Sequence, residues 1–358
     1  MSTMESKARA SVLAVDGGNT KTLALVAALD GTILGRGRSG CSDIYNTFSM
    51  ASYGQEALDL ALANLEQAIS DALDAARVKA QDLLVGVFNL AGADWPEDFA
   101  LLRAAMQTRG FGQTIIVQND AFGVLHTGHA DPMGVSILCG TGAAVGARGP
   151  GGRSWHASYW LDTGGSIDLG RKTLELVYRS ALGLAAPTTL TGRVLDLFQV
   201  ETVEDVLHRL TGRETRKLHI RQIDRLAPAL LDEAHAGDSL ARGLVREHGN
   251  ALGLYANVAA RRVGLTDSAF PLVLAGGVLR HPSPLLADAI VEAVRAASPA
   301  VQPARAPFEP VVGVLFSALA AAGVQLDTRL AARVTGQFDG GSIREEMPLT
   351  ERFTGDEV

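Results

Sequence analysis

The sequence has little cysteine. Cys41 and Cys139 are the only two in 358 residues, one in each half of the chain, with no Cys-x-x-Cys pair. No Cys/His cluster stands at metal-ligand spacing either. Structural zinc, an iron–sulfur cluster within one chain and a disulfide framework therefore find no support in the sequence.

The chain also lacks an excess of positive charge and long apolar runs. Its formal net charge is −7 at pH 7, so no basic surface is available to neutralise a nucleic-acid backbone, although a small anion held locally is compatible with it. No run reaches the length that spans a bilayer. The amino terminus, "MSTMESKARA", has no apolar stretch of the kind found in signal peptides. We expect a cytoplasmic protein that binds neither membrane nor nucleic acid.

What the chain does have is the composition of a globular protein. Hydrophobic residues make up 47% and charged residues 20%, and the 39 glycines indicate many tight turns. A chain of 358 residues suits two domains of ordinary size, each able to bury its own core. A two-domain enzyme is the expectation.

The first third of the chain shows alternating strand and helix patterns. Short aliphatic runs predict strands, and apolar residues at helical spacing predict helices. The predicted strands are Ser11 to Val15, Thr22 to Leu29, Thr32 to Gly37, Leu83 to Gly92 and Thr114 to Asp120; the predicted helices are Ala51 to Arg77 and one that opens at Asp94.

The strand pattern then restarts. Residues Met133 to Trp155 again read as strand, glycine turn, strand, turn and strand. Small residues occupy the first turn of both copies, Asp16-Gly17-Gly18 and Gly140-Thr141-Gly142. This repetition indicates two related domains. Further on, we expect helices over Leu174 to Leu265, a late strand in Phe270 to Arg280, a closing helix over Pro310 to Gly323 and a frayed tail from Gly336.

The two glycine turns are suited to phosphate. Glycine permits a backbone that brings N–H groups against an anion, and two such turns could close on a triphosphate from both sides. In the first turn Asp16 would hold Mg²⁺ through waters, while Asn19, Thr20, Lys21 and Thr22 offer donors. A plain tight hairpin is the alternative for each turn taken alone.

Two other nucleotide motifs fit less well. "GSIDLGRKT", Gly165 to Thr173, has Arg171 inserted before the lysine of a Walker A loop and no strong strand ahead of it. "GTGAAVG", Gly140 to Gly146, follows a strand as a dinucleotide fingerprint does. The sequence after it breaks on glycines within a few residues, which favours a second strand over the helix of a Rossmann unit.

Five motifs in order give the chain a family resemblance. They are "DGGNTKT" (Asp16 to Thr22), "NDA" (Asn119 to Ala121), "GTGA" (Gly140 to Ala143), "LAGGV" (Leu274 to Val278) and "PVVGVLFSAL" (Pro310 to Leu319). Over roughly Ser11 to Gly323 the chain resembles the sugar kinase/actin/heat-shock-protein ATPases. More narrowly, it is similar to the BadF/BadG/BcrA/BcrD ATPase family, which includes N-acetylglucosamine kinases.

The resemblance implies an α/β fold of two RNase H-like domains, each a mixed five-stranded sheet flanked by helices. The division would be 1–121 and 122–335 with a tail over 336–358, and the closing helix would pack back towards the first domain. ATP with Mg²⁺ would lie in the cleft between the domains. The residues implied to contact it are Gly17, Gly18, Asn19, Thr20, Lys21, Thr22, Gly140, Thr141, Gly142, Gly276 and Gly277, with Asp16 at the metal.

Asp120 is implied as the general base. Its position agrees, because an acid just past the end of a strand could accept the proton of a hydroxyl that attacks the γ-phosphorus. A helix-capping role is the alternative for Asp120. For Asp94, followed by Trp95-Pro96-Glu97, we expect capping rather than ligand contact, with Glu97 closing the box.

The sequence departs from the kinase pattern where the sugar binds. The family's turn with an asparagine after the third strand corresponds here to Gly40 to Phe48, with Asp43 near the expected place and Asn46 further on. The family's Gly-Asp-Glu-Gly-Ser run corresponds to Trp160 to Lys172, where Thr163-Gly164 replace the acidic pair and Asp162 stands one position earlier. Sugar contacts are therefore expected from Asn119, Asp120, Asp43 and Asp162.

The predicted function is ATP-dependent phosphorylation of an amino sugar, N-acetylglucosamine first, at its 6-hydroxyl, by an enzyme that forms a homodimer as its relatives commonly do. The alternative is a partner-coupled ATPase of the BadF type without sugar phosphorylation. Those dehydratase activators hold an iron–sulfur cluster with spaced cysteines, which this chain lacks. A sugar-responsive regulator would need a DNA-binding module ahead of the first strand, where only about ten residues stand. A dinucleotide-dependent oxidoreductase is the last of the alternative functions.

Overall fold

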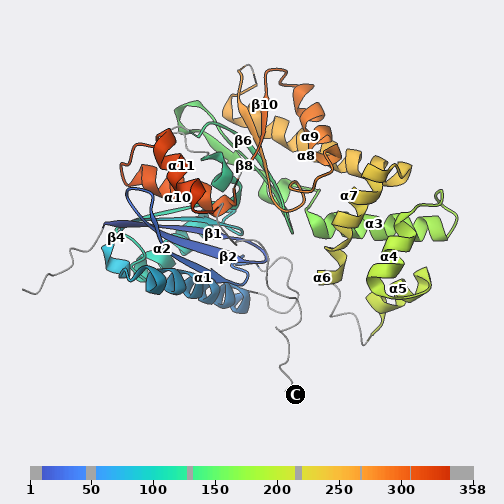
Figure 1. Cartoon of the computed structure of the whole chain (residues 1–358), viewed down its shortest axis with the longest axis horizontal. Helices are drawn as coiled ribbons and strands as arrows, with labels where there is room; N and C mark the ends of the chain where they lie inside the picture. The colour runs from blue at the N-terminus through green and yellow to red at the C-terminus, as the bar shows by residue number, and fades with distance from the viewer. Residues whose placement is uncertain are drawn as a thin grey trace, which may run out of the picture.

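Two five-stranded sheets and the helices around them make up the molecule (Figure 1). A computed structural model describes residues 10–45, 54–126, 132–213, 220–266, 268–306 and 308–338. Each sheet is mixed, with three antiparallel strands followed by two parallel ones. The predicted fold class is confirmed.

The first sheet has the order β3-β2-β1-β4-β5. Its strands are β1 (Ser11–Gly17), β2 (Thr22–Ala28), β3 (Ile33–Ser39), β4 (Leu83–Leu90) and β5 (Thr114–Asn119). Helices α1 (Gln55–Ala76) and α2 (Pro96–Thr108) and the short 3₁₀ turn η1 (Ala80–Asp82) lie between them in sequence.

Both faces of the first sheet are buried, so β1 and β2 are apolar throughout. Leu13 and Val15 pack with α1 and α2 on one face. Val12 and Ala14 pack on the other face against helix α10 (Pro310–Ala321). Figure 1 shows α1 and α10 on opposite sides of this sheet. The helix from the far end of the chain therefore completes the core of the first half.

The second sheet has the order β10-β9-β6-β7-β8. Its strands are β6 (Gly134–Cys139), β7 (Ala143–Arg148), β8 (Ser154–His156), β9 (Pro271–Ala275) and β10 (Gln302–Arg305). Read from β8, the order β8-β7-β6-β9-β10 repeats that of the first sheet. The repetition predicted from the two glycine turns is thus present in the strand order, and Gly140 to Gly146 leads into strand β7 as expected.

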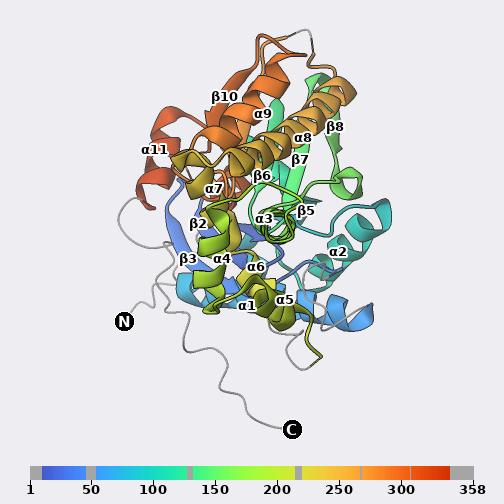
Figure 2. The ribbon, with the colours of Figure 1, turned by 90° about the vertical axis from the view of Figure 1, so that its right-hand side faces the viewer.

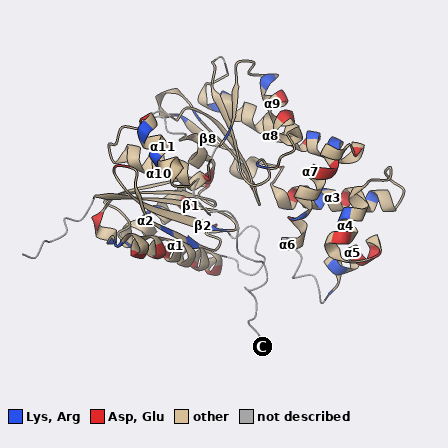
Figure 3. Ribbon diagram, in the orientation of Figure 1, with Lys and Arg blue, Asp and Glu red and all other residues tan. Residues whose placement is uncertain are grey.

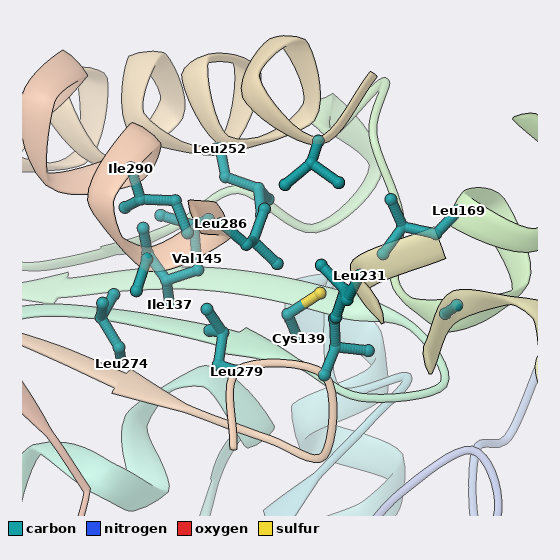
Figure 4. Close-up of a cluster of buried hydrophobic side chains, with 14 of the residues drawn as sticks. Ile137, Cys139, Val145, Leu169, Leu231, Leu252, Leu274, Leu279, Leu286 and Ile290 are labelled. Atoms are coloured by element: carbon teal, nitrogen blue, oxygen red, sulfur yellow. The ribbon is translucent and has the colours of Figure 1, made fainter. Parts of the chain in front are cut away.

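Helices cover this second sheet and extend beyond it. They are α3 (Ser166–Ala181), α4 (Leu190–Phe198), α5 (Val203–Thr211), α6 (Ile220–Ile223), α7 (Leu226–Ala236), α8 (Ser239–Val263) and α9 (Leu285–Arg295). Figure 2 shows α8 and α9 side by side over the strands. In Figure 4, Leu252, Leu286 and Ile290 from these helices meet Ile137 and Val145 of the sheet.

Two crossing segments join the halves. The 3₁₀ helix η2 (Asp120–Leu125) follows β5 and contacts β6 and β7, and α10 contacts both η2 and the first sheet. Gly313 of α10 faces the Gly123 carbonyl so closely that a Cβ on Gly313 would stand 1.9 Å from that oxygen. Only glycine allows the two segments to approach this closely.

Several predicted boundaries differ from the structure. The strand predicted to reach Gly92 ends at Leu90, and Asp120 begins η2 rather than ending β5. Helix α1 begins at Gln55; residues 46–53, with Asn46 and the predicted helix start at Ala51, lie outside the described residues. Helix α11 (Thr328–Gly336), β10 and α9 were not predicted. Of the predicted tail, residues 339–358 also lie outside the described part.

The distribution of charge agrees with the composition. Figure 3 shows Lys/Arg and Asp/Glu interspersed on outer helices such as α5 and α9. In the described part of the chain, every helix is too short or too polar to cross a bilayer.

Candidate active site

A cavity of about 520 Å³ brings together the segments predicted to bind nucleotide. Its lining includes Gly18, Asn19, Thr20 and Lys21 of the β1–β2 turn, Gly140, Thr141 and Gly142 of the β6–β7 turn, Gly276 and Gly277 after β9, and both Asp16 and Asp120.

The two glycine turns meet across this cavity. The hydroxyl groups of Thr20 and Thr141 are hydrogen-bonded, with 2.7 Å between their oxygens. Each turn is closed by its own backbone: the Gly18 N–H donates to the Lys21 carbonyl at 3.0 Å, and the Gly140 N–H to the Gly142 carbonyl at 2.9 Å. The shape of each turn is therefore set by its own backbone hydrogen bond, and the two turns face each other from two sheets.

The turn after β9 lies against the end of β6. Gly276 has φ of +102°, and a Cβ there would stand 2.4 Å from the Cys139 carbonyl oxygen. That carbonyl accepts a hydrogen bond from the Val278 N–H at 3.0 Å. Glycine is required at 276 on both counts, and its packing places Gly277 on the cavity wall beside the second turn.

The carboxylate of Glu309 pairs with two of the cationic side chains that line the cavity. Glu309, just before α10, pairs with Lys21 at 3.4 Å and with Arg280 at 2.8 Å. Lys21 comes from the first turn and Arg280 from the segment after Gly277, so one side chain links three separated parts of the chain. The sequence contains no local signal for Glu309, because its partners are distant in sequence.

Two of the predicted nucleotide-contacting residues are not part of the cavity lining. Thr22 is fully buried, and its hydroxyl donates to the Gly40 carbonyl at 2.8 Å. Gly17 is buried at the base of the turn, where its carbonyl accepts from the Ala91 N–H at 2.8 Å. Both residues therefore hold the turn through hydrogen bonds to the protein on the side away from the cavity.

Asp16 ends β1 and lines the cavity beneath the first turn. Burial, followed by the negative charge of Glu309, raises the pKa of Asp16 to about 7, against the opposing charge of Lys21. Next to it, the side-chain oxygen of Asn19 is buried without a hydrogen-bond partner. A carboxylate and an orphaned amide oxygen fit a hard cation such as Mg²⁺, which prefers oxygen ligands and keeps several waters. Among the described residues, no group of three or more His, Cys, Asp or Glu side chains is arranged around a metal position.

Asp120 lies at the crossing between the two halves. Burial, followed by the charges of Asp16, Asp94 and Asp43, raises the pKa of Asp120 to about 7. The capping hydrogen bond of η2 belongs to Asn119, whose Oδ1 accepts from the Ala121 N–H at 3.1 Å. Asp120 therefore lines the cavity as a carboxyl group whose pKa is raised towards neutrality, the range that suits a general base.

Beside Asp120 stands a group of polar side chains from both halves. Asp94 Oδ1 accepts hydrogen bonds from Asn119 Nδ2 at 2.9 Å and from Ser158 Oγ at 2.7 Å. Asp43 is buried and accepts from the Tyr45 N–H at 3.0 Å. Burial raises the pKa of Asp94, while its bond from Ser158 acts in the opposite direction. The four carboxylates Asp16, Asp43, Asp94 and Asp120 thus form an acidic region that suits sugar hydroxyls and a metal better than an anion.

The predicted cap of α2 is wrong. The carboxylate that accepts from the Asp94 and Trp95 N–H groups, at 3.2 and 2.8 Å, is that of Asp98. Trp95 is the capping position, so the helix begins one residue later than predicted. The Asp94 carboxylate does not cap the helix and instead accepts hydrogen bonds from Asn119 and Ser158. Sequence alone favoured Glu97 because it stands three residues after Asp94.

Asp162 is not brought to this acidic region. It is exposed on the segment before α3 and is not part of the cavity lining, and its N–H donates to the Tyr255 hydroxyl at 3.3 Å. Thr163, which replaces an acid of the family motif, is buried with its hydroxyl 3.1 Å from His248 Nδ1. Asn119 is brought to the region, but both ends of its amide already bind protein groups.

The sequence matches the BadF/BadG/BcrA/BcrD ATPase family over residues 13–318. The chain belongs to this family. Membership implies use of ATP, and the cavity between the two glycine turns is where the family motifs come together.

Curated relatives cover most of the chain. It is 25% identical over 276 residues to an N-acetylmuramic acid/N-acetylglucosamine kinase of Clostridium acetobutylicum, covering 75% of this chain and 86% of the relative. It is also 25% identical over 317 residues to an N-acetyl-D-glucosamine kinase of Dictyostelium discoideum, covering 86% and 97%.

Solved structures share the fold. A candidate N-acetylglucosamine kinase from Chromobacterium violaceum aligns with a TM-score of 0.62 and 22% identity, covering 87% of this chain and 99% of that one. A ROK family glucokinase from Streptomyces griseus, in complex with glucose and AMPPNP, aligns with a TM-score of 0.51 and 17% identity, covering 86% and 98%.

Proposed function

We propose that the chain is an ATP-dependent kinase that transfers the γ-phosphate to a hydroxyl of an amino sugar, most directly the 6-hydroxyl of N-acetylglucosamine. The observation that carries the proposal is the position of Asp120, which lines the cavity between two phosphate-type turns and adjoins the carboxylates Asp43 and Asp94. The two kinases named as curated relatives, at 25% identity, support the same acceptor class.

The nucleotide would lie between the two turns. Backbone N–H groups of the first turn, over Gly18 to Lys21, and of Gly140 to Gly142 would face the phosphates, and Lys21 would exchange Glu309 for a phosphate oxygen. The adenosine would lie towards Gly276 and Gly277. Asp16 and Asn19 would hold Mg²⁺, which neutralises charge on the phosphates when bound.

Asp120 would act as the general base. As the acceptor hydroxyl oxygen attacks the γ-phosphorus, its proton passes to the Asp120 carboxylate, the bond from the γ-phosphorus to the bridging oxygen breaks, and ADP leaves with that oxygen. Asp43 and Asp94 would accept hydrogen bonds from other sugar hydroxyls, and Asn119 would orient Asp94. Asp162 would contribute only after movement of the segment before α3.

The two halves would behave as domains, 1–121 and 122–335, that close on the sugar and exclude water. α10 packs on the first sheet although it belongs by sequence to the second half. We place the enzyme in the cytoplasm, where ATP is available, and as a homodimer; light scattering after gel filtration tests the assembly.

The first experiment is ADP release with Mg-ATP and each of N-acetylglucosamine, glucosamine, N-acetylmuramic acid, glucose or no sugar. Strong stimulation by an amino sugar is the expected result, and it identifies the substrate at the same time. ATP turnover that is the same with every sugar would contradict the proposal.

One observation favours a second candidate, a partner-coupled ATPase. The Trp160 to Lys172 segment lacks the family's acidic pair, and its Thr163 hydroxyl contacts the buried His248. A second observation argues against a member of this class that holds an iron–sulfur cluster. Cys139 is fully buried, and burial raises the pKa of its thiol to about 12, so it is unsuited to ligate a cluster shared between subunits. Sugar-independent ATP turnover would favour this candidate.

A further inference from the structure

A second cavity, of about 800 Å³, adjoins the acidic region, and of its lining residues only Asp94 has a role in the function proposed above. Asp94 and Ser158 lie on its wall, so it opens next to the side chains proposed to hold the sugar. Its other walls come from β5, α2, η2 and the segment from β7 to η4 (Ser158–Trp160), which belong to both halves of the molecule. Its volume falls within the range of about 300–1,000 Å³ typical of small-molecule sites.

Tryptophan is concentrated here. The chain has three tryptophans, and all three, Trp95, Trp155 and Trp160, line this cavity. Trp95 is 46% exposed and Trp160 69% exposed. In a chain whose aromatic content is only 5%, exposed indole rings gathered from both halves at one cavity indicate a ligand surface rather than a core.

The aromatic rings are ordered against one another across the two halves. Trp95 stacks on Tyr159 with 6.1 Å between ring centroids and 11° between planes. Tyr45 meets Tyr159 edge-on at 5.8 Å. Tyr45 is held in turn by its hydroxyl, which donates to Asp98 Oδ1 at 2.8 Å. Contacts within the protein therefore hold these aromatic rings in place, and ordered rings lower the entropy cost of binding a ligand.

The backbone that carries this wall is strained. Ser158 has φ of +42°, a conformation that a residue with a side chain rarely adopts. Its hydroxyl is held by Asp94 at 2.7 Å and by a short contact with His156 Nδ1. Strain maintained by hydrogen bonds is concentrated at functional segments. Here it places Tyr159 and Trp160 at the cavity.

Polar groups are interspersed with the rings. Arg148 lies over the Phe122 ring, 5.0 Å from its centroid, and donates to Gln118 Oε1 at 2.7 Å. Arg148, Gln118 and His156 all line the cavity. Aromatic faces combined with amide, imidazole and guanidinium groups match a sugar ring, which presents C–H groups on its faces and hydroxyls around its edge.

We propose that this cavity binds a second pyranose ring, so that the enzyme accepts an amino-sugar disaccharide with one ring at Asp120 and the other against the tryptophans. The inference rests on the proposed function for the placement of the first ring. The junction between the two rings would lie at Asp94 and Ser158, which line the aromatic cavity and adjoin the acidic region.

Because every tryptophan lines this cavity, intrinsic fluorescence reports its occupancy without any catalytic assay. Titration of the full chain with N,N′-diacetylchitobiose should change the emission and give a Kd at least tenfold lower than that for N-acetylglucosamine. Trp160→Ala and Trp95→Ala should each remove most of that preference, as measured by competition with monosaccharide turnover. Leu254→Ala, which truncates a 63% exposed side chain on α8, is the matched control and should retain it.

The outcomes separate the two claims. Equal Kd values for the disaccharide and the monosaccharide, or a preference that survives both tryptophan substitutions in folded protein, would overturn the second-ring site while monosaccharide turnover still supports the kinase. A fluorescence-detected disaccharide preference without ADP release from any sugar would support the site and overturn the kinase.

Discussion

The hydroxyls of Thr20 and Thr141 lie 2.7 Å apart, although 121 residues separate them in the sequence. Each stands at the tip of a glycine turn, one from each sheet, so this hydrogen bond brings the two phosphate-type turns to the distance at which a triphosphate could contact both.

Replacing Asp120 with Asn should abolish phosphoryl transfer. An amide cannot accept the hydroxyl proton, and general-base catalysis contributes about 10²–10⁴-fold in rate. ATP binding should change little, because Asp120 is placed at the acceptor side. ADP release measures the first effect and calorimetric titration with ATP the second. Turnover close to that of the unmodified enzyme would rule out Asp120 as the base.

Activity should fall on the acid side of neutrality. Burial, then the charges of Asp16, Asp94 and Asp43, raises the pKa of Asp120 to about 7, and the base must be unprotonated to act. Below that pH, kcat/KM for the sugar should drop about tenfold per pH unit. A profile that stays flat from about pH 5 to about pH 8 would contradict this assignment.

The same carboxyl should affect stability in the opposite sense. Its folded pKa of about 7 lies above the ordinary value of 3.8, so the folded state holds a proton that the unfolded chain releases. The stabilising contribution is fully present below the unfolded pKa and is lost as pH rises through about 7. Thermal melts should show a weaker pH dependence in Asp120→Asn across this window. Identical pH dependence in both proteins would exclude Asp120 as the source.

Asp94→Ala and Asp98→Ala should have separate effects. Asp94 adjoins Asp120 and is proposed to hold the sugar, so its loss should raise the sugar KM at least tenfold and leave the ATP KM unchanged. Asp98 accepts from the two N–H groups at the start of α2. Its loss should reduce the free energy of unfolding by about 1 kcal/mol, as the loss of a helix cap does. If Asp94→Ala proved the more destabilising and left the sugar KM intact, the corrected cap would be in error.

Gly313→Ala should destabilise the fold. A Cβ at 313 would stand 1.9 Å from the Gly123 carbonyl oxygen, which forces the two crossing segments apart, and such overpacking costs about 1–3 kcal/mol. Gly192→Ala is the matched control: this exposed helical glycine has nothing within 4 Å of its added Cβ. That change should stabilise by up to about 1 kcal/mol through helix propensity. Equal melting temperatures for the two variants would refute the close approach.

Local features of the sequence were sufficient to predict both glycine turns and every described strand except β10. Strands β1 and β2 are apolar on both faces because helices cover both faces of the sheet. The glycine turns could be predicted from their small residues. Asp120 could be located because it directly follows a strand. The contacts of Asp94 could not be predicted, because the cap of α2 is supplied by Asp98 and the hydrogen-bond partner of Asp94, Ser158, stands 64 residues away.

Tertiary contacts also explain the other missed features. Glu309 shows no pattern of its own, and its partner Lys21 is 288 residues distant. The tryptophans are spread over 66 positions of sequence, from 95 to 160, and only the meeting of the two halves collects them at one cavity. The β10 strand is short and exposed, so it lacks the apolar pattern by which strands are recognised.

Glu309 also gives the cleft an anion of its own, next to the cations that would face a phosphate. Glu309 contacts both Lys21 and Arg280, so one carboxylate holds two cations close together and offsets one of their two positive charges. A polyphosphate bound as proposed would compete with this internal anion for Lys21 and Arg280. Nucleotide affinity would then be the difference between two charge pairings, so we expect a triphosphate to compete with Glu309 far better than a nucleoside, which has no phosphate.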